Sequence, residues 1–244
     1  MRIAIVSDIH GNRAAFEAVL TDLKETSADL VLHAGDLADS GSSPAEIVDH
    51  IRDLGWNGVL GNTDEMHSRP ESLNEFVSQS AAPTSLWAAV REMAAETHAR
   101  LGDERIAWLR TLPCTLTYGS VAVVHASPEN LWQSPRPESS DDGLKTIYNP
   151  LGRPNVVFGR IHRSFVRSLR YAEHPELIFV NSGSVGLPYD GDPRAAYVLI
   201  EDSKAIVRRV EYDVEEEVNA LAESCLPHWD WVARMLRSGS PQLP

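Results

Sequence analysis

Side chains that bind first-row divalent metal ions recur in short polar clusters along the chain. The five clusters are Asp8-Ile9-His10-Gly11-Asn12, Gly35-Asp36-Leu37-Ala38-Asp39, Gly61-Asn62-Thr63-Asp64, His125 and Gly159-Arg160-Ile161-His162. Each alone is weak evidence, because Gly-Asp and Gly-Asn-Thr-Asp are ordinary turn sequences and a single histidine is more often structural. Turn propensity does not predict five such clusters in order. Together they indicate a metal site, and a bound divalent ion makes water a nucleophile near neutral pH.

Each cluster directly follows a predicted strand. The predicted strands are residues 2–7, 29–34, 57–60, 121–125 and 156–158, and the first three alternate with helices, including 44–54. This alternation is typical of a parallel sheet. In open α/β sheets the loops at the carboxyl ends of the strands converge on one crevice, so we expect the five clusters to meet there. The glycines before Asp36, Asn62 and Arg160 allow the tight backbone that aims a side chain inward.

The rest of the chain predicts one domain over residues 1–244. An alanine-rich helical segment at about 70–110 interrupts the strand–helix rhythm and is predicted to be a lid, the alternative being an extra helical layer that does not touch substrate. Residues 127–140 are predicted to be an ordered loop. Strands at 115–118, 164–170, 177–180, 196–200 and 205–210, with short turns such as Asp202-Ser203-Lys204, favour a second, more antiparallel sheet, and helices are predicted at about 214–238.

Composition excludes several classes of protein. A formal net charge of −13 argues against non-specific binding to nucleic acid, which needs a basic surface, but allows a small phosphorylated substrate held at a local positive site. No apolar segment approaches the length of a membrane span. The two cysteines, Cys114 and Cys225, are far apart and form no disulfide framework, so a cytoplasmic location is predicted.

Taken as an ordered set, Asp8-X-His10, Gly35-Asp36, Gly61-Asn62, His125 and Gly159-X-X-His162 resemble the motifs of the calcineurin-like metallophosphoesterase superfamily. The likeness is greatest to its small bacterial and archaeal phosphodiesterases and diadenosine-tetraphosphatase-like proteins, and it extends to about Asp213. It implies an α/β (α+β) fold, a four-layer α-β-β-α sandwich of two mixed sheets flanked by helices, here with a helical lid insertion.

The resemblance also implies a ligand set. A first metal ion would be bound by Asp8, His10, Asp36 and His162. A second would share Asp36 and add Asn62, His125 and the residue at position 160, where relatives usually have histidine. We predict Asp36, Asn62, His125 and Arg160 as catalytic residues, and Asn12, Asn62 and Arg160 as the residues that contact phosphate.

Arg160 departs from the family pattern, because a guanidinium group has no lone pair to offer a metal ion. Three outcomes are open: a weak second metal site with Arg160 turned aside, a guanidinium that binds a phosphate oxygen, or a degenerate site in a poor catalyst. His33 and His67 are candidate replacement ligands. His33 lies in a strand and favours a structural role, whereas for His67 the two roles are equally supported.

Thr63 is a second departure, since many relatives place there a histidine that protonates the leaving group. Threonine has no suitable pKa, so the leaving group must be good or be protonated by water or another residue. The simplest role for Asp64 is that of a structural acceptor within the turn. Asn12 suits a helix N-cap, a phosphate contact, or both, and Asp39 suits a residue that orients a metal ligand.

The predicted function is therefore hydrolysis, through metal-bound hydroxide, of a phosphodiester or phosphoanhydride in a small substrate such as a nucleotide. One or two divalent ions are expected, with Mn favoured among Mn, Fe, Zn, Co and Ni. The alternatives are a catalytically weak regulator that binds phosphate or nucleotide, and a phosphoprotein phosphatase. Oligomeric state and substrate identity stay open, because Trp87, Met93 and Trp108 suit the core as well as base stacking.

Overall fold

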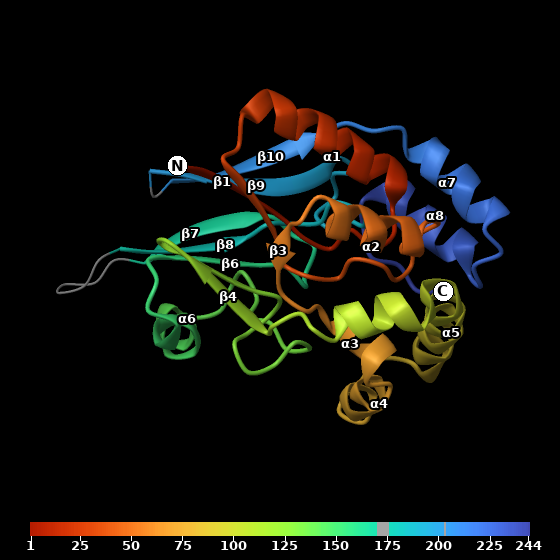
Figure 1. The fold of residues 1–244 in the computed structure, drawn as a ribbon. Coiled ribbons are helices and arrows are strands. Elements are labelled where there is room, and N and C mark those ends of the chain that lie inside the picture. The colour runs from red at the N-terminus through yellow and green to blue at the C-terminus, as the bar shows by residue number, and fades with distance from the viewer. Residues whose placement is uncertain (170–175, 203) are drawn as a thin grey trace.

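The computed structural model describes residues 1–169, 176–202 and 204–244. Two five-stranded sheets form the centre of the molecule (Figure 1). The end of the strand predicted at 164–170 and the middle of the turn predicted at 202–204 lie outside the described residues.

The first sheet has the strand order β10-β9-β1-β2-β3. Its parallel part is β1 (Arg2–Val6), β2 (Leu30–His33) and β3 (Asn57–Gly58), as the strand–helix alternation predicts. β9 (Ala195–Glu201) pairs antiparallel with β1, and β10 (Lys204–Val210) pairs antiparallel with β9. The prediction that these last two strands belong to the second sheet is wrong. The error arises because a hairpin fixes only the pairing of its own two strands and not the sheet that it joins.

The second sheet has the order β4-β5-β6-β8-β7. Its strands are β4 (Thr115–Tyr118), β5 (Val121–Val124), β6 (Asn155–Phe158), β7 (Phe165–Leu169) and β8 (Leu177–Asn181). β5, β6 and β8 run parallel, while β4 and β7 are antiparallel at the two edges. Both sheets are therefore mixed: the parallel strands occupy one side of the first sheet and the centre of the second.

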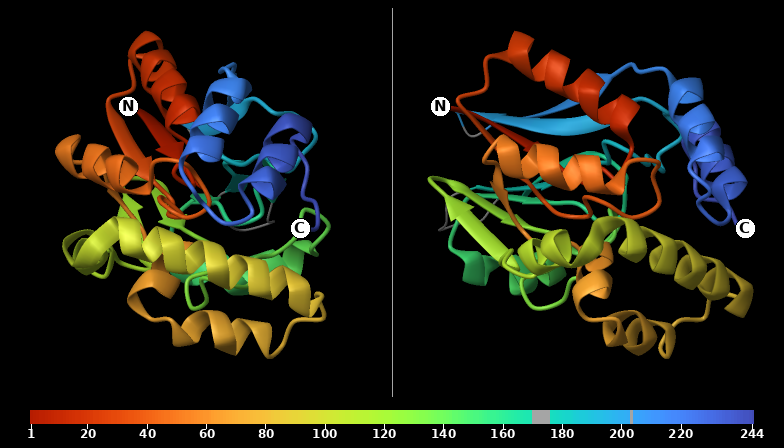
Figure 2. Two further views of the ribbon diagram at one scale, coloured as in Figure 1. Left: turned by 90° about the vertical axis from the view of Figure 1, so that its right-hand side faces the viewer. Right: turned by 45° about the vertical axis from the view of Figure 1, so that its right-hand side comes forward.

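Three apolar layers hold the sandwich together. Ile3 and Ile5 of β1 meet Val123 and Val157 of the second sheet in the layer between the sheets. The alternate β1 residues face the other way and pack beneath α1 (Arg13–Thr26) and α2 (Pro44–Asp53). Beyond the second sheet, Phe158 and its neighbours pack against α6 (Asp141–Tyr148), which a short 3-10 turn at Asn149–Leu151 follows. This arrangement, seen in Figures 1 and 2, is the predicted four-layer sandwich.

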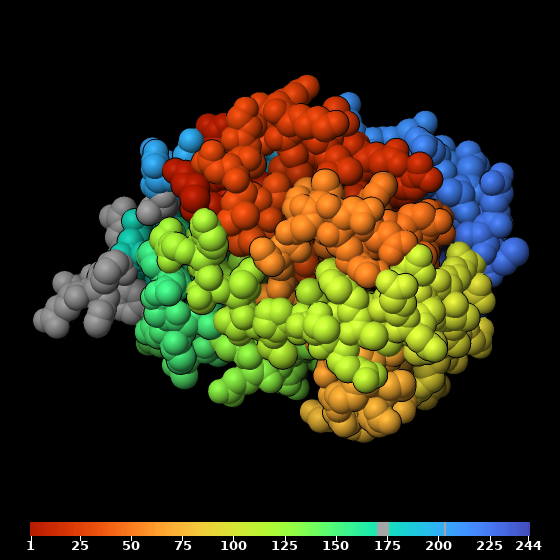
Figure 3. All heavy atoms as spheres, viewed as in Figure 1, coloured from red at the N-terminus to blue at the C-terminus, as the bar shows by residue number. Residues whose placement is uncertain are grey.

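The remaining helices gather at one end of the sandwich. They are α3 (Asn62–Ser68), α4 (Glu71–Val77), α5 (Thr84–Leu109), α7 (Val214–Glu223) and α8 (Trp229–Ser238). The segment predicted as a lid consists of α4 and α5, and α5 is kinked at Gly102, where φ is +67°. α3 and α6 were not predicted. Figure 3 shows atoms of α1, α2 and α5 next to one another, in that order from top to bottom, on one face of the molecule.

A buried carboxylate fixes α7 to the N-terminus of α1. Glu217 is 1% exposed and accepts a hydrogen bond of 2.9 Å from the Ser42 N–H, and the N–H groups of Arg13 and Ala14 also point to it. Burial outweighs these donors and raises the pKa of Glu217 to about 7.

Candidate metal centre

The polar clusters lie at the carboxyl ends of the central strands, as the topology requires. Asp8 and His10 follow β1, and Asp36 follows β2. Asn62 is the first residue of α3, beyond β3, whereas His125 and His162 follow β5 and β6 of the second sheet. Because the two sheets stack with these strand ends on the same side, the clusters from both sheets share one crevice.

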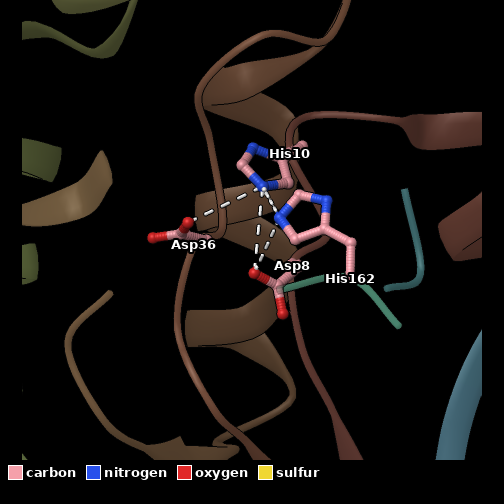
Figure 4. Close-up of side chains that lie close together, drawn as sticks. All are labelled: Asp8, His10, Asp36 and His162. Carbon is pink, nitrogen blue, oxygen red and sulfur yellow. Dashed lines mark hydrogen bonds and ion pairs between the residues drawn. The ribbon is translucent and has the colours of Figure 1, made fainter. Parts of the chain in front are cut away.

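Four of the predicted ligands form one compact group. The ligand atoms of Asp8, His10, Asp36 and His162 all lie within 4.8 Å of one another, and all four side chains are buried. His162 Nε2 is 3.1 Å from Asp8 Oδ1 and 3.2 Å from His10 Nε2, and His10 Nε2 is 3.6 Å from Asp36 Oδ2 (Figure 4). These distances suit a cation placed among the four side chains.

The tautomers of the two histidines show that the residues fit a metal ion. His10 Nδ1 donates to the Asp39 carbonyl at 2.9 Å, and His162 Nδ1 donates to the Leu187 carbonyl at 2.5 Å. In a neutral ring the proton is thus on Nδ1 and the lone pair is on Nε2. Burial and the neighbouring His162 lower the pKa of His10, which favours its neutral form. Two lone pairs that face each other at 3.2 Å repel unless a cation lies between them.

A second group shares Asp36. His125 Nε2 is 2.8 Å from Asn62 Oδ1 and 3.4 Å from Asp36 Oδ2, while its Nδ1 donates to the Ala34 carbonyl at 2.7 Å. Burial lowers the pKa of His125, but the Asp36 carboxylate outweighs it and raises the pKa to about 9. These three residues offer a second ion a carboxylate, an amide oxygen and an imidazole.

The backbone at the site adopts a conformation that non-glycine residues rarely use. Asp8, His10, Asp36 and His162 have φ between +52° and +55°, and Arg160 has φ +73°. Each such residue costs about 1–2 kcal/mol relative to right-handed backbone. Strain of this kind is retained where the geometry it produces is needed, and here every member of the four-residue group carries it.

Asp64 fixes the backbone of the loop that carries Asp36. Its carboxylate accepts from the N–H groups of Asp36, Leu37 and Gly61 at 2.8, 2.9 and 3.1 Å. Burial and the Asp36 carboxylate raise the pKa of Asp64 to about 6. The structural role suggested by the turn sequence agrees with these contacts.

The Arg160 side chain lies against Phe76. Its backbone N–H donates to both Asp8 carboxylate oxygens, at 3.1 and 3.2 Å, whereas its guanidinium carbon lies 5.8 Å from the centre of the Phe76 ring. Its Nε is buried and has no acceptor within the part of the chain that the structure describes. The side chain lines the crevice beside the metal ligands and offers a positive charge there.

Neither candidate replacement ligand joins the site. His33 is fully buried, and burial lowers its pKa to about 4. His67 Nε2 lies 3.5 Å from Asp39 Oδ1, and its ring lines a separate hollow with His98.

Two further polar residues of the clusters are already engaged in supporting contacts. Asn12 caps α1 by accepting from the Ala15 N–H at 3.0 Å and donates to the Gly186 carbonyl at 2.9 Å. Asp39 orients His10 through its backbone carbonyl rather than through its side chain.

A cavity of about 290 Å³ opens over the metal ligands. Trp87 and Met93, which the sequence left ambiguous, line it, whereas Trp108 packs in the core. Sequence reasoning missed Tyr189, whose ring stacks on His162 with centroids 4.5 Å apart. It also missed Phe76, Trp132, Trp231 and Met235. Trp132 had a visible signal, because a large aromatic residue stands in an otherwise polar loop.

No helix among residues 1–169, 176–202 and 204–244 is both long and apolar enough to cross a bilayer.

Known proteins resemble this chain over nearly its whole length. An uncharacterized protein of Methanocaldococcus jannaschii is 31% identical, with 93% of this chain and 94% of that protein covered. The crystal structure of a metallophosphoesterase from Sphaerobacter thermophilus is 26% identical, with a TM-score of 0.77 and coverage of 98% of this chain and 100% of that one. A structure described as a candidate diadenosine tetraphosphatase shares the fold at 21% identity, a TM-score of 0.51 and coverage of 86% and 94%.

Residues 1–204 match the calcineurin-like phosphoesterase superfamily domain, and this range of residues includes all five polar clusters. The resemblance drawn from the clusters is thus confirmed, and with it the expectation of a metal-dependent hydrolase. The chain belongs to the calcineurin-like phosphoesterase superfamily.

Proposed function

We propose that this protein hydrolyses a phosphodiester or phosphoanhydride bond in a small substrate whose phosphate lies between the metal ligands and Arg160. The observation that carries the proposal is the pair of histidine Nε2 atoms 3.2 Å apart at the floor of a cavity. The facing lone pairs of that pair favour a cation between them, and the guanidinium that lines the same cavity supplies a positive charge that attracts a phosphate oxygen.

Asp8, His10, Asp36 and His162 would hold the first ion, and Asp36, Asn62 and His125 would hold a second. The ion, when bound, lowers the pKa of a water molecule and neutralises charge that gathers on the phosphate oxygens. Arg160 binds a non-bridging phosphate oxygen, a role that its donor geometry suits.

The class of substrate follows from whether a side chain near the metal ligands can protonate the leaving group. Thr63 cannot donate a proton as an acid, which favours diesters and anhydrides with good leaving groups over alkyl monoesters. We further propose that α4 and α5 form the lid of a single domain over this cavity. Such a cover favours a small substrate over a phosphoprotein. Manganese as the native ion and a cytoplasmic location stay predictions.

The test combines metal content with turnover. Protein prepared without chelator and supplied with Mn²⁺ should hydrolyse bis(4-nitrophenyl) phosphate, and Asp36→Asn should abolish this while the variant still folds. The matched control Asp53→Asn, at an exposed position of α2, should retain activity. Stabilisation by phosphate with no turnover across Mn²⁺, Fe²⁺, Zn²⁺, Co²⁺ and Ni²⁺ would instead support the regulator.

Metals per chain, measured by elemental analysis, decide how Arg160 acts. Two Mn²⁺ per chain would mean that the second site forms without a ligand from position 160. One would mean that the guanidinium works beside a single ion, and Arg160→His should then add a second ion. Arg160→Met, which keeps the length and loses the charge, should raise KM for the diester in either case.

A further inference from the structure

The cavity over the metal centre has two chemically different ends. The ionisable residues that line it are His10, Asp36, Asp39, Arg160 and His162, all from the strand-end clusters. Most of the other lining residues are apolar, and those from three helices form what we call the apolar wall: Leu73 and Phe76 from α4, Val90 and Met93 from α5, and Trp231 and Met235 from α8. A molecule that reaches from one end to the other must carry charge at one end and apolar surface at the other.

Arg160 marks the boundary between the two ends. Its guanidinium lies over the Phe76 ring, and the same ring packs edge-on against Trp87 with centroids 5.7 Å apart. The Phe76 ring also lies against Trp132, with centroids 5.0 Å apart. A phosphate bound by Arg160 would therefore place its organic group directly beside this aromatic cluster.

Three tryptophans line the cavity, and each carries one indole N–H group. Trp132 Nε1 donates to Glu65 at 2.7 Å, and Trp231 Nε1 donates to the Gln242 carbonyl at 2.9 Å. Trp87 Nε1, by contrast, is buried and has no acceptor within the described part of the chain. The indole N–H groups of these three tryptophans are thus either engaged or inaccessible, and they offer a ligand in the cavity no hydrogen-bond donor.

The wall offers little to a nucleobase or a sugar. Each base carries several donors and acceptors on its edge, and each one buried without a partner weakens binding. The Gln242 carboxamide donates to the Arg234 carbonyl and to Ser238 Oγ, so its donors are already engaged. A volume of about 290 Å³ is also at the small end of ligand pockets, which suits a phosphate with one ring or a short branched chain.

We infer that the substrate of this phosphoesterase carries a compact apolar group, an aromatic ring or a short branched chain. The inference rests on the proposed function, because it takes the phosphate to lie at the metal end. Two of the helices that select the organic group lie in the predicted lid. The third, α8, lies beyond residues 1–204, which match the family domain.

The experiment uses phosphonates, whose carbon–phosphorus bond places one known organic group beside the phosphate mimic. Calorimetry on the Mn²⁺-loaded protein compares methylphosphonate, phenylphosphonate and adenosine 5′-monophosphate. Phenylphosphonate should bind at least about tenfold more tightly than methylphosphonate, the gain expected when an apolar group fills an apolar pocket. Adenosine 5′-monophosphate should bind more weakly than phenylphosphonate.

Substitutions in the apolar wall test whether the organic group binds there. Val90→Asp and, independently, Met235→Ala should reduce the phenyl-to-methyl ratio to about threefold or less, while methylphosphonate affinity stays the same and reports that the metal end is intact. Ala88→Asp, at an exposed position of α5, introduces the same charge and should leave the ratio unchanged.

The outcomes separate the two proposals. Equal affinity for methyl- and phenylphosphonate in a protein that hydrolyses bis(4-nitrophenyl) phosphate overturns the apolar selection and leaves the function standing. Tighter binding of adenosine 5′-monophosphate than of phenylphosphonate overturns it in favour of a nucleotide. Absence of both phosphonate binding and hydrolysis overturns the proposed function itself.

Discussion

The buried carboxylate of Glu217 gives the sharpest quantitative prediction, because two opposing effects act on it. Burial favours its neutral form, whereas the N–H groups of Ser42, Arg13 and Ala14 favour its charged form. The net result is a pKa raised from 4.5 to about 7. The substitution Glu217→Gln replaces the titrating group by a permanently neutral one of the same shape.

The sign and size of the effect follow from linkage. Between pH 4.5 and pH 7 the folded protein holds the Glu217 proton more tightly than the unfolded chain, so raising the pH through this window lowers the free energy of unfolding. At about 1.36 kcal/mol per pKa unit, the loss is about 3 kcal/mol in total. The contribution is complete below pH 4.5 and absent above pH 7. Glu217→Gln should therefore match the wild type near pH 4.5 and exceed it by about 3 kcal/mol at pH 8.

Urea unfolding of both proteins at several pH values from 4.5 to 8 measures this difference directly. Subtracting the variant from the wild type removes the contribution of every other titrating group, including the metal ligands. Glu216→Gln, at the exposed neighbouring position of α7, should show no such trend. If Glu217→Gln is instead less stable than the wild type at pH 8, the three N–H groups outweigh burial and the reasoning is refuted.

Three other outcomes are expected. Gly159→Ala should weaken Mn²⁺ binding at least about tenfold, because a Cβ there would clash with Ser7 Oγ and Asp8 Oδ2. Calorimetry that finds the Mn²⁺ affinity unchanged would contradict the close packing at this glycine. Mn²⁺ at about 100 times its Kd should raise the free energy of unfolding by about 2.7 kcal/mol, and His162→Ala should abolish this gain in a thermal melt. Tyr148→Phe, which removes the buried hydroxyl bonded to the Ala126 carbonyl, should cost about 1–2 kcal/mol in urea unfolding and leave turnover unchanged.

Much of the fold could be predicted because strand–helix alternation specifies parallel pairing of neighbours. The pairing of β9 with β1 could not, since these strands are distant in the sequence and nothing local in either one selects its partner. The helix α6 was missed because Gly143 weakens its helical signal, although Ser140, which caps it, and the acidic residues after it are a recognisable helix start.

The candidate site, like the fold, could be predicted only in part. The proximity of the candidate ligand residues could be predicted because they lie at strand ends, and the topology brings those strand ends together. The direction of the Arg160 side chain could not be predicted, because it depends on Phe76, which comes from a helix far away in the chain. The same is true of the apolar wall, whose residues on three helices share a surface only once those helices are packed.

The ligand group draws on both sheets, and this has a consequence for how the protein folds. His10 and His162 are 152 positions apart and come from different layers of the sandwich. Contacts at such separation form late, because the entropy of closing the intervening chain is lost before they stabilise anything. A refolding chain can therefore acquire the four-residue group only after its two halves have docked. The rate at which a refolding chain gains Mn²⁺ affinity should thus report the docking of the two sheets, while far-ultraviolet circular dichroism reports the earlier formation of helices and strands.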